Sequence, residues 1–313
     1  MSRRRKTAFS PSVSSIQSLE KRELKTGNVS VEFSDRDIRD VVIEGDEAGN
    51  HITIDEIDPL YIRVTGTNGT LVNGSSQPVV VRVLDDLTIR MQGGSDHLQV
   101  RDLNLVNHNH SDLEIDMGTG EDYLGVSSVD VAREMLLRGG HANDSIILRQ
   151  STANHIEIDG EYQNDRIEVT EVTTQNDVTL DGGEGNDDIS ISDSSIADDL
   201  IIRGDADNDE VSVYGVDVED DIRVDGGSGA DELSVRFSDA EDIVIYGRTG
   251  NDVVSVYGNR LSDLLFVSLG SGNDELTFGI NRVGRHYFDG GTGEDVWDSH
   301  EFWWSWSNFH NFE

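Results

Sequence analysis

Aspartates recur along this chain at a nearly constant spacing, and each one follows a short polar loop. The steps between consecutive members are 26, 22, 21, 22, 22, 22, 21, 22 and 21 residues. The series consists of Asp96, Asp122, Asp144, Asp165, Asp187, Asp209, Asp231, Asp252, Asp274 and Asp295. Glycines precede many of them, permit positive φ angles and let backbone carbonyls converge. Carboxylates combined with carbonyls are the oxygen ligands that calcium prefers, so the pattern indicates cation binding.

Stacking these aspartates on one another creates an electrostatic problem. Neighbouring carboxylates would lie about 4.8 Å apart if each repeat were one coil of a β structure. At an effective dielectric constant of 20, the repulsion is roughly 3.5 kcal/mol for each pair before screening. We therefore expect a divalent ion, raised pKa values, or side chains that turn into water.

The constant period is typical of a solenoid, in which a single coil cannot bury its apolar face alone. Strands with alternating apolar residues lie on both sides of each loop, for example at 178–180 and 189–191. This alternation predicts an all-β chain, a single parallel β-helix or flattened β-roll solenoid with 21–22-residue coils. Ten such coils would form a rod of roughly 45–50 Å. Ankyrin or tetratricopeptide arrays need helical stripes and repeats of about 33 or 34 residues, which the chain lacks.

Four segments follow from this period. Residues 1–27 form a basic tail or targeting segment, 28–85 an irregular N-terminal cap with degenerate coils, 86–295 the regular solenoid, and 296–313 an aromatic C-terminal cap. The last segment contains all four tryptophans, Trp297, Trp303, Trp304 and Trp306. A cap is expected because the final coil would otherwise expose core and strand edges. An aromatic platform for a sugar or a partner protein is the alternative.

The charge of the chain restricts its partners. There are 62 acidic and 24 basic residues, a net charge of −38. Residues 1–27 contribute seven bases and two acids, so the rest carries 17 bases and 60 acids, or −43. Such a body repels nucleic acid and anionic membranes and attracts cations, so we expect no nucleic-acid binding.

We also expect no membrane insertion, because no run of 18 apolar residues occurs. Cysteine is absent, which excludes disulfides and thiolate metal sites.

Two of the loops fit the pattern GGxGxDxUx, in which U is a large apolar residue, at every fixed position: residues 182–190 and 226–234. The pattern resembles the hemolysin-type calcium-binding repeat of bacterial RTX proteins. That resemblance implies several Ca²⁺ ions between stacked loops. The ligands it implies are backbone carbonyls near Gly183, Gly185, Gly227 and Gly229 and the carboxylates of Asp122, Asp144, Asp187, Asp209, Asp231, Asp252, Asp274 and Asp295. The chain departs from that family in its period, because RTX coils turn every 18 residues or about two nonapeptides. Some loops, such as 161–165 and 205–209, also lack glycine.

The N-terminal segment points to export. A basic start, residues 3–6, is followed by no apolar stretch, so an ordinary signal peptide is not evident. Residues 19–27, Leu-Glu-Lys-Arg-Glu-Leu-Lys-Thr-Gly, resemble the LExRxLL segment of many exported or surface proteins of planctomycete bacteria, with Lys25 in place of the second leucine. The resemblance implies an extracellular or cell-surface location. A short charged helix is the alternative.

Two further columns run beside the aspartate series. One is acidic and contains Asp86, Asp112, Glu134, Asp177, Asp199, Asp221 and Asp242. No glycine pattern accompanies it, so we interpret it as a solvated face, with a weak ion site as the alternative. The other contains Asn143, Asn164, Asn186, Asn208, Asn251 and Asn273. We interpret it as a ladder of stacked amides, with metal ligation as the alternative.

No sequence pattern of catalysis is present. A nucleophile elbow, a phosphate loop and a His-Glu-x-x-His motif are all missing, and the arginines of the body share no common column. We therefore expect a calcium-binding acidic solenoid with a structural, surface or adhesive role and no catalysis. Its partners besides calcium would be an extracellular polysaccharide or a cell-surface protein. The alternative is a parallel β-helix that binds or degrades polysaccharide.

Overall fold

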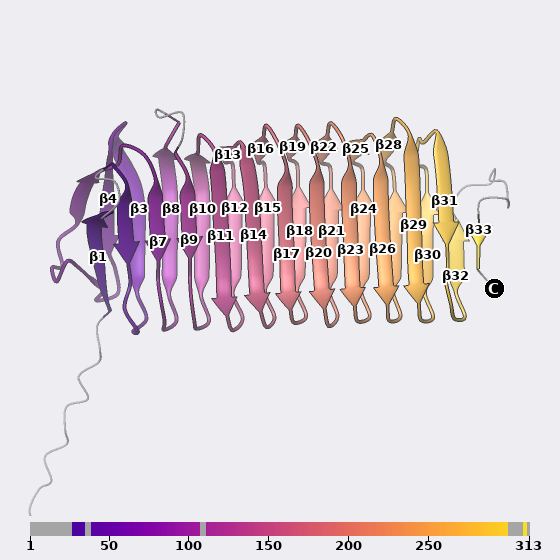
Figure 1. Cartoon of the computed structure of the whole chain (residues 1–313), viewed down its shortest axis with the longest axis horizontal. Coiled ribbons are helices and arrows are strands. Elements are labelled where there is room, and N and C mark those ends of the chain that lie inside the picture. Colours follow the sequence, from indigo (N-terminus) through magenta and orange to yellow (C-terminus); the bar gives the residue numbers. More distant parts are fainter. Residues whose placement is uncertain (1–26, 35–38, 107–110, 300–308, 312–313) are drawn as a thin grey trace, which may run out of the picture.

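A computed structural model describes residues 27–34, 39–106, 111–299 and 309–311, and within these ranges the chain is all-β without a helix (Figure 1). As the sequence predicts, it forms a parallel β-solenoid with one repeat per coil. Neighbouring coils pair in register, so Ile167 lies beside Ile189 and Ile189 lies beside Val211. Equivalent residues of successive repeats therefore form columns along the rod.

The strands that precede the aspartate loops form the first face. They are β2 (Val41–Glu44), β7 (Leu87–Arg90), β9 (Leu113–Asp116), β11 (Glu134–His141), β14 (His155–Tyr162), β17 (Val178–Glu184), β20 (Leu200–Ala206), β23 (Ile222–Ser228), β26 (Ile243–Thr249), β29 (Leu264–Ser271), β31 (Arg285–Asp289) and β33 (Phe309–His310).

The strands that follow the loops form the second face. They are β3 (His51–Asp58), β8 (His97–Asn104), β10 (Tyr123–Asp130), β12 (Ser145–Arg149), β15 (Arg166–Thr170), β18 (Asp188–Ser192), β21 (Glu210–Tyr214), β24 (Glu232–Arg236), β27 (Val253–Tyr257), β30 (Glu275–Gly279) and β32 (Val296–Ser299).

The core lies between the two faces. In β17, Val178 and Leu180 are fully buried while Thr179 between them is half-buried on the outer side. The same alternation in β18 buries Ile189 and Ile191. Because β-branched and leucine side chains repeat in register, one apolar core runs along the whole rod.

A third strand of two residues closes most coils, and the sequence interpretation, which expected two strands per coil, missed it. These strands are β13 (Thr152–Ala153), β16 (Thr173–Thr174), β19 (Ser195–Ile196), β22 (Asp217–Val218), β25 (Asp239–Ala240) and β28 (Arg260–Leu261). In β8 and β10 the second and third strands are continuous, as the pairing of Asp130 with Thr152 shows. Two residues are too short to produce a recognisable alternation, which explains the omission.

The N-terminal end departs from the parallel pattern. Strand β1 (Asn28–Phe33) pairs antiparallel with β2, and β4 (Tyr61–Gly66) pairs antiparallel with β3 and β6 (Val79–Arg82). Strand β5 (Leu71–Val72) lies parallel to β1. The loop between β2 and β3 holds the place of a degenerate repeat loop, because β2 and β3 pair parallel with β7 and β8 of the next coil.

At the C-terminal end, the ring of Trp297 lies 5.9 Å from that of Phe278 and packs against the core. Within the predicted aromatic cap, residues 300–308 and 312–313 lie outside the described residues, as do residues 1–26 of the predicted tail.

Candidate functional site

The aspartate loops share one backbone path, whether or not they contain glycine. The residues four and two positions before each aspartate have positive φ angles in all ten loops. In the loop of Asp187 these are Gly183 (96°) and Gly185 (144°). In the loop of Asp209 they are Asp205 (71°) and Asp207 (74°). Loops without glycine therefore take the same left-handed turns, at a conformational cost that glycine avoids.

Close stacking gives a second reason for these glycines. A Cβ on Gly183 would lie 2.2 Å from the carbonyl oxygen of Glu161 in the preceding loop. At Gly227 the corresponding distance to the carbonyl of Asp205 is also 2.2 Å. Each such carbonyl therefore points along the rod at the Cα of the next loop.

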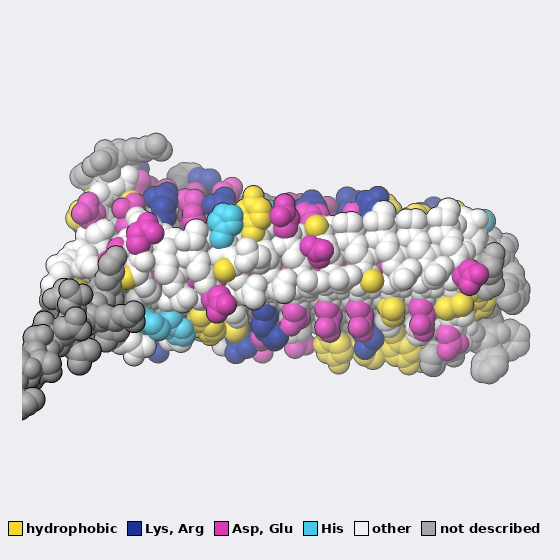
Figure 2. Space-filling model, turned by 90° about the horizontal axis from the view of Figure 1, so that it is seen from below, with side chains coloured by type: hydrophobic (Ala, Val, Ile, Leu, Met, Phe, Trp, Pro, Cys, Tyr) yellow, Lys and Arg dark blue, Asp and Glu magenta, His cyan; other side chains and the backbone are white. Residues whose placement is uncertain are grey.

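The aspartates turn inward, and their side chains join the coils. All ten are between 0% and 4% exposed. In each, Oδ1 accepts a hydrogen bond from a backbone N–H in the preceding coil, at 2.6–3.0 Å. For nine of them the donor is the preceding aspartate of the column, and for Asp96 it is Asn50. Figure 2 looks onto this edge, where the surface is mostly backbone and uncharged side chains.

The second carboxylate oxygen has no such partner. The Oδ2 atoms of all ten aspartates are buried and make no hydrogen bond among the described residues. A Cβ on Gly204 would lie 2.3 Å from Asp209 Oδ2 and 2.6 Å from the Gly226 carbonyl oxygen of the next coil. At Gly160 both corresponding distances, to Asp165 Oδ2 and the Gly182 carbonyl, are 2.5 Å. The two oxygens thus border one small space beside the glycine Cα.

A carboxylate oxygen and a carbonyl oxygen are both acceptors, so neither can satisfy the other. A proton on the carboxyl group or a cation beside it can satisfy both. An unpaired buried charge would otherwise be costly. This oxygen-only donor set fits calcium, which takes carboxylate and carbonyl ligands together.

The opposite corner of the solenoid provides an internal comparison. There too, inward polar side chains accept a backbone N–H from the preceding coil, as Asn259 Oδ1 does from Ser238 at 2.9 Å. These side chains also donate. Asn259 Nδ2 bonds to the Val235 carbonyl at 2.9 Å, and Ser194 Oγ bonds to the Ser192 carbonyl at 2.8 Å. Serine and asparagine are self-sufficient in this role, whereas ionised aspartate lacks the donor.

Asn50 supplies the missing donor within the aspartate corner itself, although its own Oδ1 is buried without a hydrogen-bond partner among the described residues. It occupies the column position in the first, degenerate coil, and its Nδ2 donates to the Ala48 carbonyl at 2.6 Å. A Cβ on Gly45 would lie 3.0 Å from this nitrogen and 2.4 Å from the Met91 carbonyl of the next coil. In this coil, the amide nitrogen of Asn50 therefore lies beside the Met91 carbonyl oxygen, at the place that Oδ2 occupies in the other coils.

Burial dominates the acidity of the column. Loss of hydration raises the pKa of Asp96, Asp165 and Asp209 to about 8, against the opposing effect of the backbone hydrogen bonds. The same cause raises the pKa of Asp122 and Asp144 to about 7, and that of Asp187, Asp252 and Asp274 to about 6. Near neutral pH, protons and cations therefore compete for these carboxylates.

The structure brings all ten aspartates of the series together in one column, both the eight predicted as calcium ligands and Asp96 and Asp165. The four predicted glycines lie at the left-handed positions of the same loops. Sequence reasoning missed the role of the first motif glycine, five residues before the aspartate. A Cβ on Gly182 or Gly226 would lie only 2.4 or 2.5 Å from Oδ2 of its own aspartate. The repeated Gly-Gly pair was the available signal.

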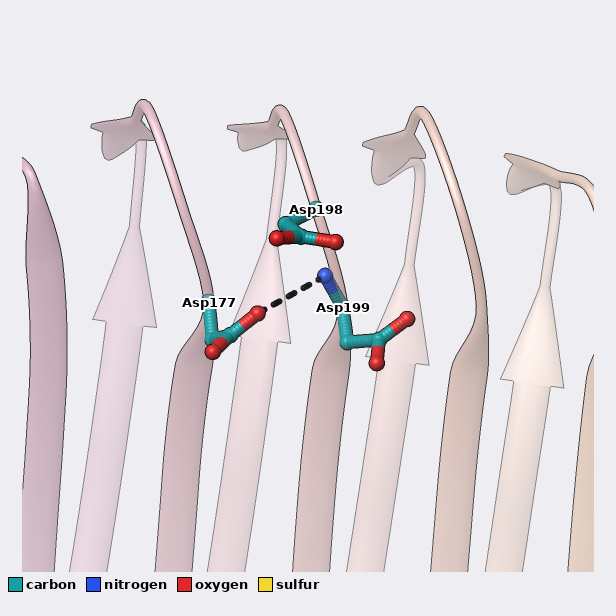
Figure 3. Close-up of side chains that lie close together, drawn as sticks. All are labelled: Asp177, Asp198 and Asp199. Carbon is teal, nitrogen blue, oxygen red and sulfur yellow. Dashed lines mark hydrogen bonds between the residues drawn. The ribbon is translucent and has the colours of Figure 1, made fainter.

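The acidic column on the first face serves a different purpose. Asp177 Oδ1 accepts the backbone N–H of Asp199 in the following coil at 3.2 Å (Figure 3). Asp112, Asp199 and Asp242 make equivalent bonds. Asp177, Asp198 and Asp199 lie close enough for their carboxylates to share an ion, but all three are partly exposed to solvent. The hydrogen bonds account for this column without a metal.

The asparagine column forms the predicted ladder. Asn186 Nδ2 donates to Asn164 Oδ1 at 3.3 Å, and Asn208 Nδ2 donates to Asn186 Oδ1 at 2.8 Å. The same Oδ1 atoms accept backbone N–H groups of the following coil. These oxygens are therefore occupied by coil-to-coil bonds.

A further group of carboxylates lies on the outer first face, beside an open groove of about 630 Å³. Burial, followed by the charges of Asp205 and Asp159, raises the pKa of Asp181 to about 7. Arg203 lies 3.6 Å from Asp181. Such a group can hold a shared proton.

Comparison with known proteins adds no identity. No helix in the part of the chain that the structure describes has the length and apolar character needed to cross a membrane. No family model, curated protein or solved structure matches the chain.

Proposed function

We propose that this chain is a calcium-binding acidic β-solenoid with a structural or adhesive role outside the cell. The observation that carries the proposal is the row of ten buried Oδ2 atoms, each without a hydrogen-bond donor. Serine and asparagine do the same structural work at the opposite corner with both hydrogen-bond roles filled. An aspartate in this position stabilises the fold only if a proton or a cation satisfies its Oδ2 atom.

The residues that would hold calcium are the column aspartates through Oδ2, together with neighbouring backbone carbonyls such as those of Gly182 and Gly226. Bound calcium would supply positive charge that offsets the repulsion along the column. Because the loops form only when the coils stack, ion binding would stabilise the folded rod by mass action. The proposal assigns the chain no reaction.

An extracellular or surface location is part of this proposal. The absence of cysteine and the acidic body are compatible with it, and the N-terminal segment resembles an export-associated motif. Calcium outside cells reaches concentrations that weak sites of this class require, about 10⁻⁴–10⁻³ M.

The test compares thermal unfolding, followed by circular dichroism, in calcium, in EGTA and in magnesium. We expect a calcium-specific rise in melting temperature. In Asp187→Asn, the new amide can donate to the neighbouring carbonyl as Asn50 does. This variant should melt higher than the wild type in EGTA and gain less from calcium.

Asp188→Asn is the matched control, because its carboxylate is 46% exposed and lies next in the chain. It should leave the calcium response unchanged. The proposal fails if calcium and magnesium act equally, or if both variants behave alike.

Glycan binding is a second candidate, favoured by aromatic rings that recur at coil spacing. Tyr246, Phe266 and Tyr287 on β26, β29 and β31 form a row with ring centroids 5.7 and 5.4 Å apart. The last two rings are nearly parallel, with an interplanar angle of 4°. The row presents ring edges and tyrosine hydroxyl groups at coil spacing, along which successive units of a linear glycan would lie.

A further inference from the structure

A second aromatic group lies at the corner opposite the aspartate loops. Tyr214 ends β21, Tyr257 ends β27, and Phe237 follows β24 between them. The Phe237 ring meets those of Tyr214 and Tyr257 edge-on, with centroids 5.5 and 5.6 Å apart. Tyr214 and Phe237 are 49% and 50% exposed. Exposed aromatic groups of this kind on a strongly acidic body mark interaction sites.

The aromatic group stands at a corner where the backbone of each coil is left-handed, as it is at Asp193 (51°) and Ile280 (51°). Phe237 has a φ of 55°, in the left-handed region that bulky residues avoid. The same position in the neighbouring coils is Gly215 (65°) and Gly258 (79°). A Cβ on Gly258 would lie 2.6 Å from the Phe237 ring, so this glycine leaves the space that the ring occupies. The left-handed corner is a property of every coil, whereas an exposed aromatic ring at this position is specific to the coil of Phe237.

An open groove of about 730 Å³ runs over the short strands of the same coils, β22, β25 and β28. The three aromatic residues border this groove rather than line it, and Phe237 is separated from Asp239 of the groove by a single residue. Arg260 Nη1 lies 3.5 Å from Asp239 Oδ2. The charged side chains that line the groove are Asp217, Glu219, Asp239, Glu241, Arg260 and Arg282.

Carboxylates thus outnumber guanidinium groups in the groove by four to two. The surrounding body carries the same excess, which repels polyanions and attracts cations. A ligand for this place needs apolar faces for the rings, hydroxyl groups for the carboxylates, and positive charge. Amino-sugar polymers with free amines combine all three.

We propose that this groove binds a polysaccharide of amino sugars. Sugar rings pack on Phe237, Tyr214 and Tyr257, and ammonium groups pair with the groove carboxylates and ring faces. The coil spacing of about 4.8 Å lets a linear glycan follow the rod axis. The inference rests on the glycan-binding candidate above, adds a second place for the glycan besides the row of Tyr246, Phe266 and Tyr287, and names a ligand class.

The test is calorimetric titration of the full chain, in calcium, with glucosamine oligomers that carry free amines. The N-acetylated oligomers and an oligogalacturonate are the comparison ligands. We expect the free-amine oligomer to bind best, and its affinity to fall with salt. Phe237→Gly should weaken that binding by roughly two- to tenfold, as expected for the loss of one aromatic contact.

Phe237→Gly should keep its β signal and melt no lower, because glycine already occupies the position in both neighbouring coils. Gln150→Gly is the matched control, since Gln150 has a φ of 51° at the same position four coils away. It should leave glycan affinity unchanged. Equal affinity of Phe237→Gly and the wild type overturns the site while leaving the glycan candidate standing. Equal binding of the three ligands overturns the amino-sugar class.

The absence of any glycan binding overturns both the site and the candidate, whatever the calcium response. A change in oligomeric state of Phe237→Gly without glycan binding assigns the cluster to a second copy of the chain. That result also overturns the proposal.

Discussion

An aspartate and an asparagine occupy equivalent inward positions at the two corners of this solenoid, and the difference between them is one hydrogen-bond donor. Asn259 and Asn281 each accept one backbone bond and donate another. The column aspartates accept one and leave Oδ2 without a donor. The identity of this residue, rather than the shape of the loop, therefore decides whether a proton or cation is needed.

Much of this site could be predicted at the level of residue type. The constant spacing predicts a column of aspartates, and the glycines predict left-handed loop positions. The inward direction of Asp187 could not be predicted, because it depends on the space beside Gly182 and on the preceding coil. The left-handed Gln163 and Asp207 were equally hidden, because residue type alone disfavours that conformation.

Proton binding by the column predicts an unusual pH dependence. The folded-state pKa values of about 6 to 8 lie above the unfolded value of about 3.9. The folded state therefore binds more protons, and stability falls as pH rises through this range. In EGTA, the melting temperature should decrease between pH 5.5 and pH 8.5, as circular dichroism can measure. A rise over that range would contradict the buried position of the column.

Calcium should change this profile most at the alkaline end. The eight carboxylates whose pKa values are raised to about 6 to 8 are mostly ionised at pH 8.5 and free to bind the metal, whereas at pH 5.5 most of them are protonated. The gain in melting temperature from calcium should thus be larger at pH 8.5. A gain that is independent of pH would place calcium elsewhere on the surface.

At the scale of the strand and loop, side chains connect each coil in both directions. Asp187 binds the preceding coil through its Oδ1, while Asn186 binds the following one through its own. Sequence alternation predicts the two long strands of each coil because four or five residues show the pattern. It cannot predict β19, whose two residues carry only one inward side chain, Ile196.

That single side chain should nevertheless contribute substantially to stability. Ile196 is 1% exposed, so Ile196→Ala leaves a cavity and should cost about 2–4 kcal/mol in free energy of unfolding. Ser195→Ala in the same strand faces outward and should cost well under 1 kcal/mol. Urea unfolding measures both. Equal small effects would show that the third side of the coil is not part of the cooperative core.

At the scale of the whole molecule, the distribution of charge matters more than its sum. The edge formed by the aspartate loops is largely uncharged on its surface (Figure 2), although its buried carboxylates are numerous. Exposed acids on the two faces are accessible to salt, whereas the buried column is not. The exposed carboxylates should therefore respond to any salt, whereas the buried carboxylates of the column should respond to calcium.

The salt concentration can be used to distinguish the exposed carboxylates of the faces from the buried carboxylates of the column. Raising NaCl from 0.02 to 0.5 M shortens the Debye length from roughly 20 Å to about 4 Å and screens the faces. The melting temperature in EGTA should rise by a few degrees as face repulsion weakens. The additional rise from 5 mM calcium should persist at high salt, because buried oxygens bind the ion directly and are screened little.

If 0.5 M NaCl abolishes the calcium effect, calcium acts only as a counterion, and the metal sites in the column are excluded. If the effect persists in the wild type but shrinks in Asp187→Asn, the column is the place where calcium stabilises the rod.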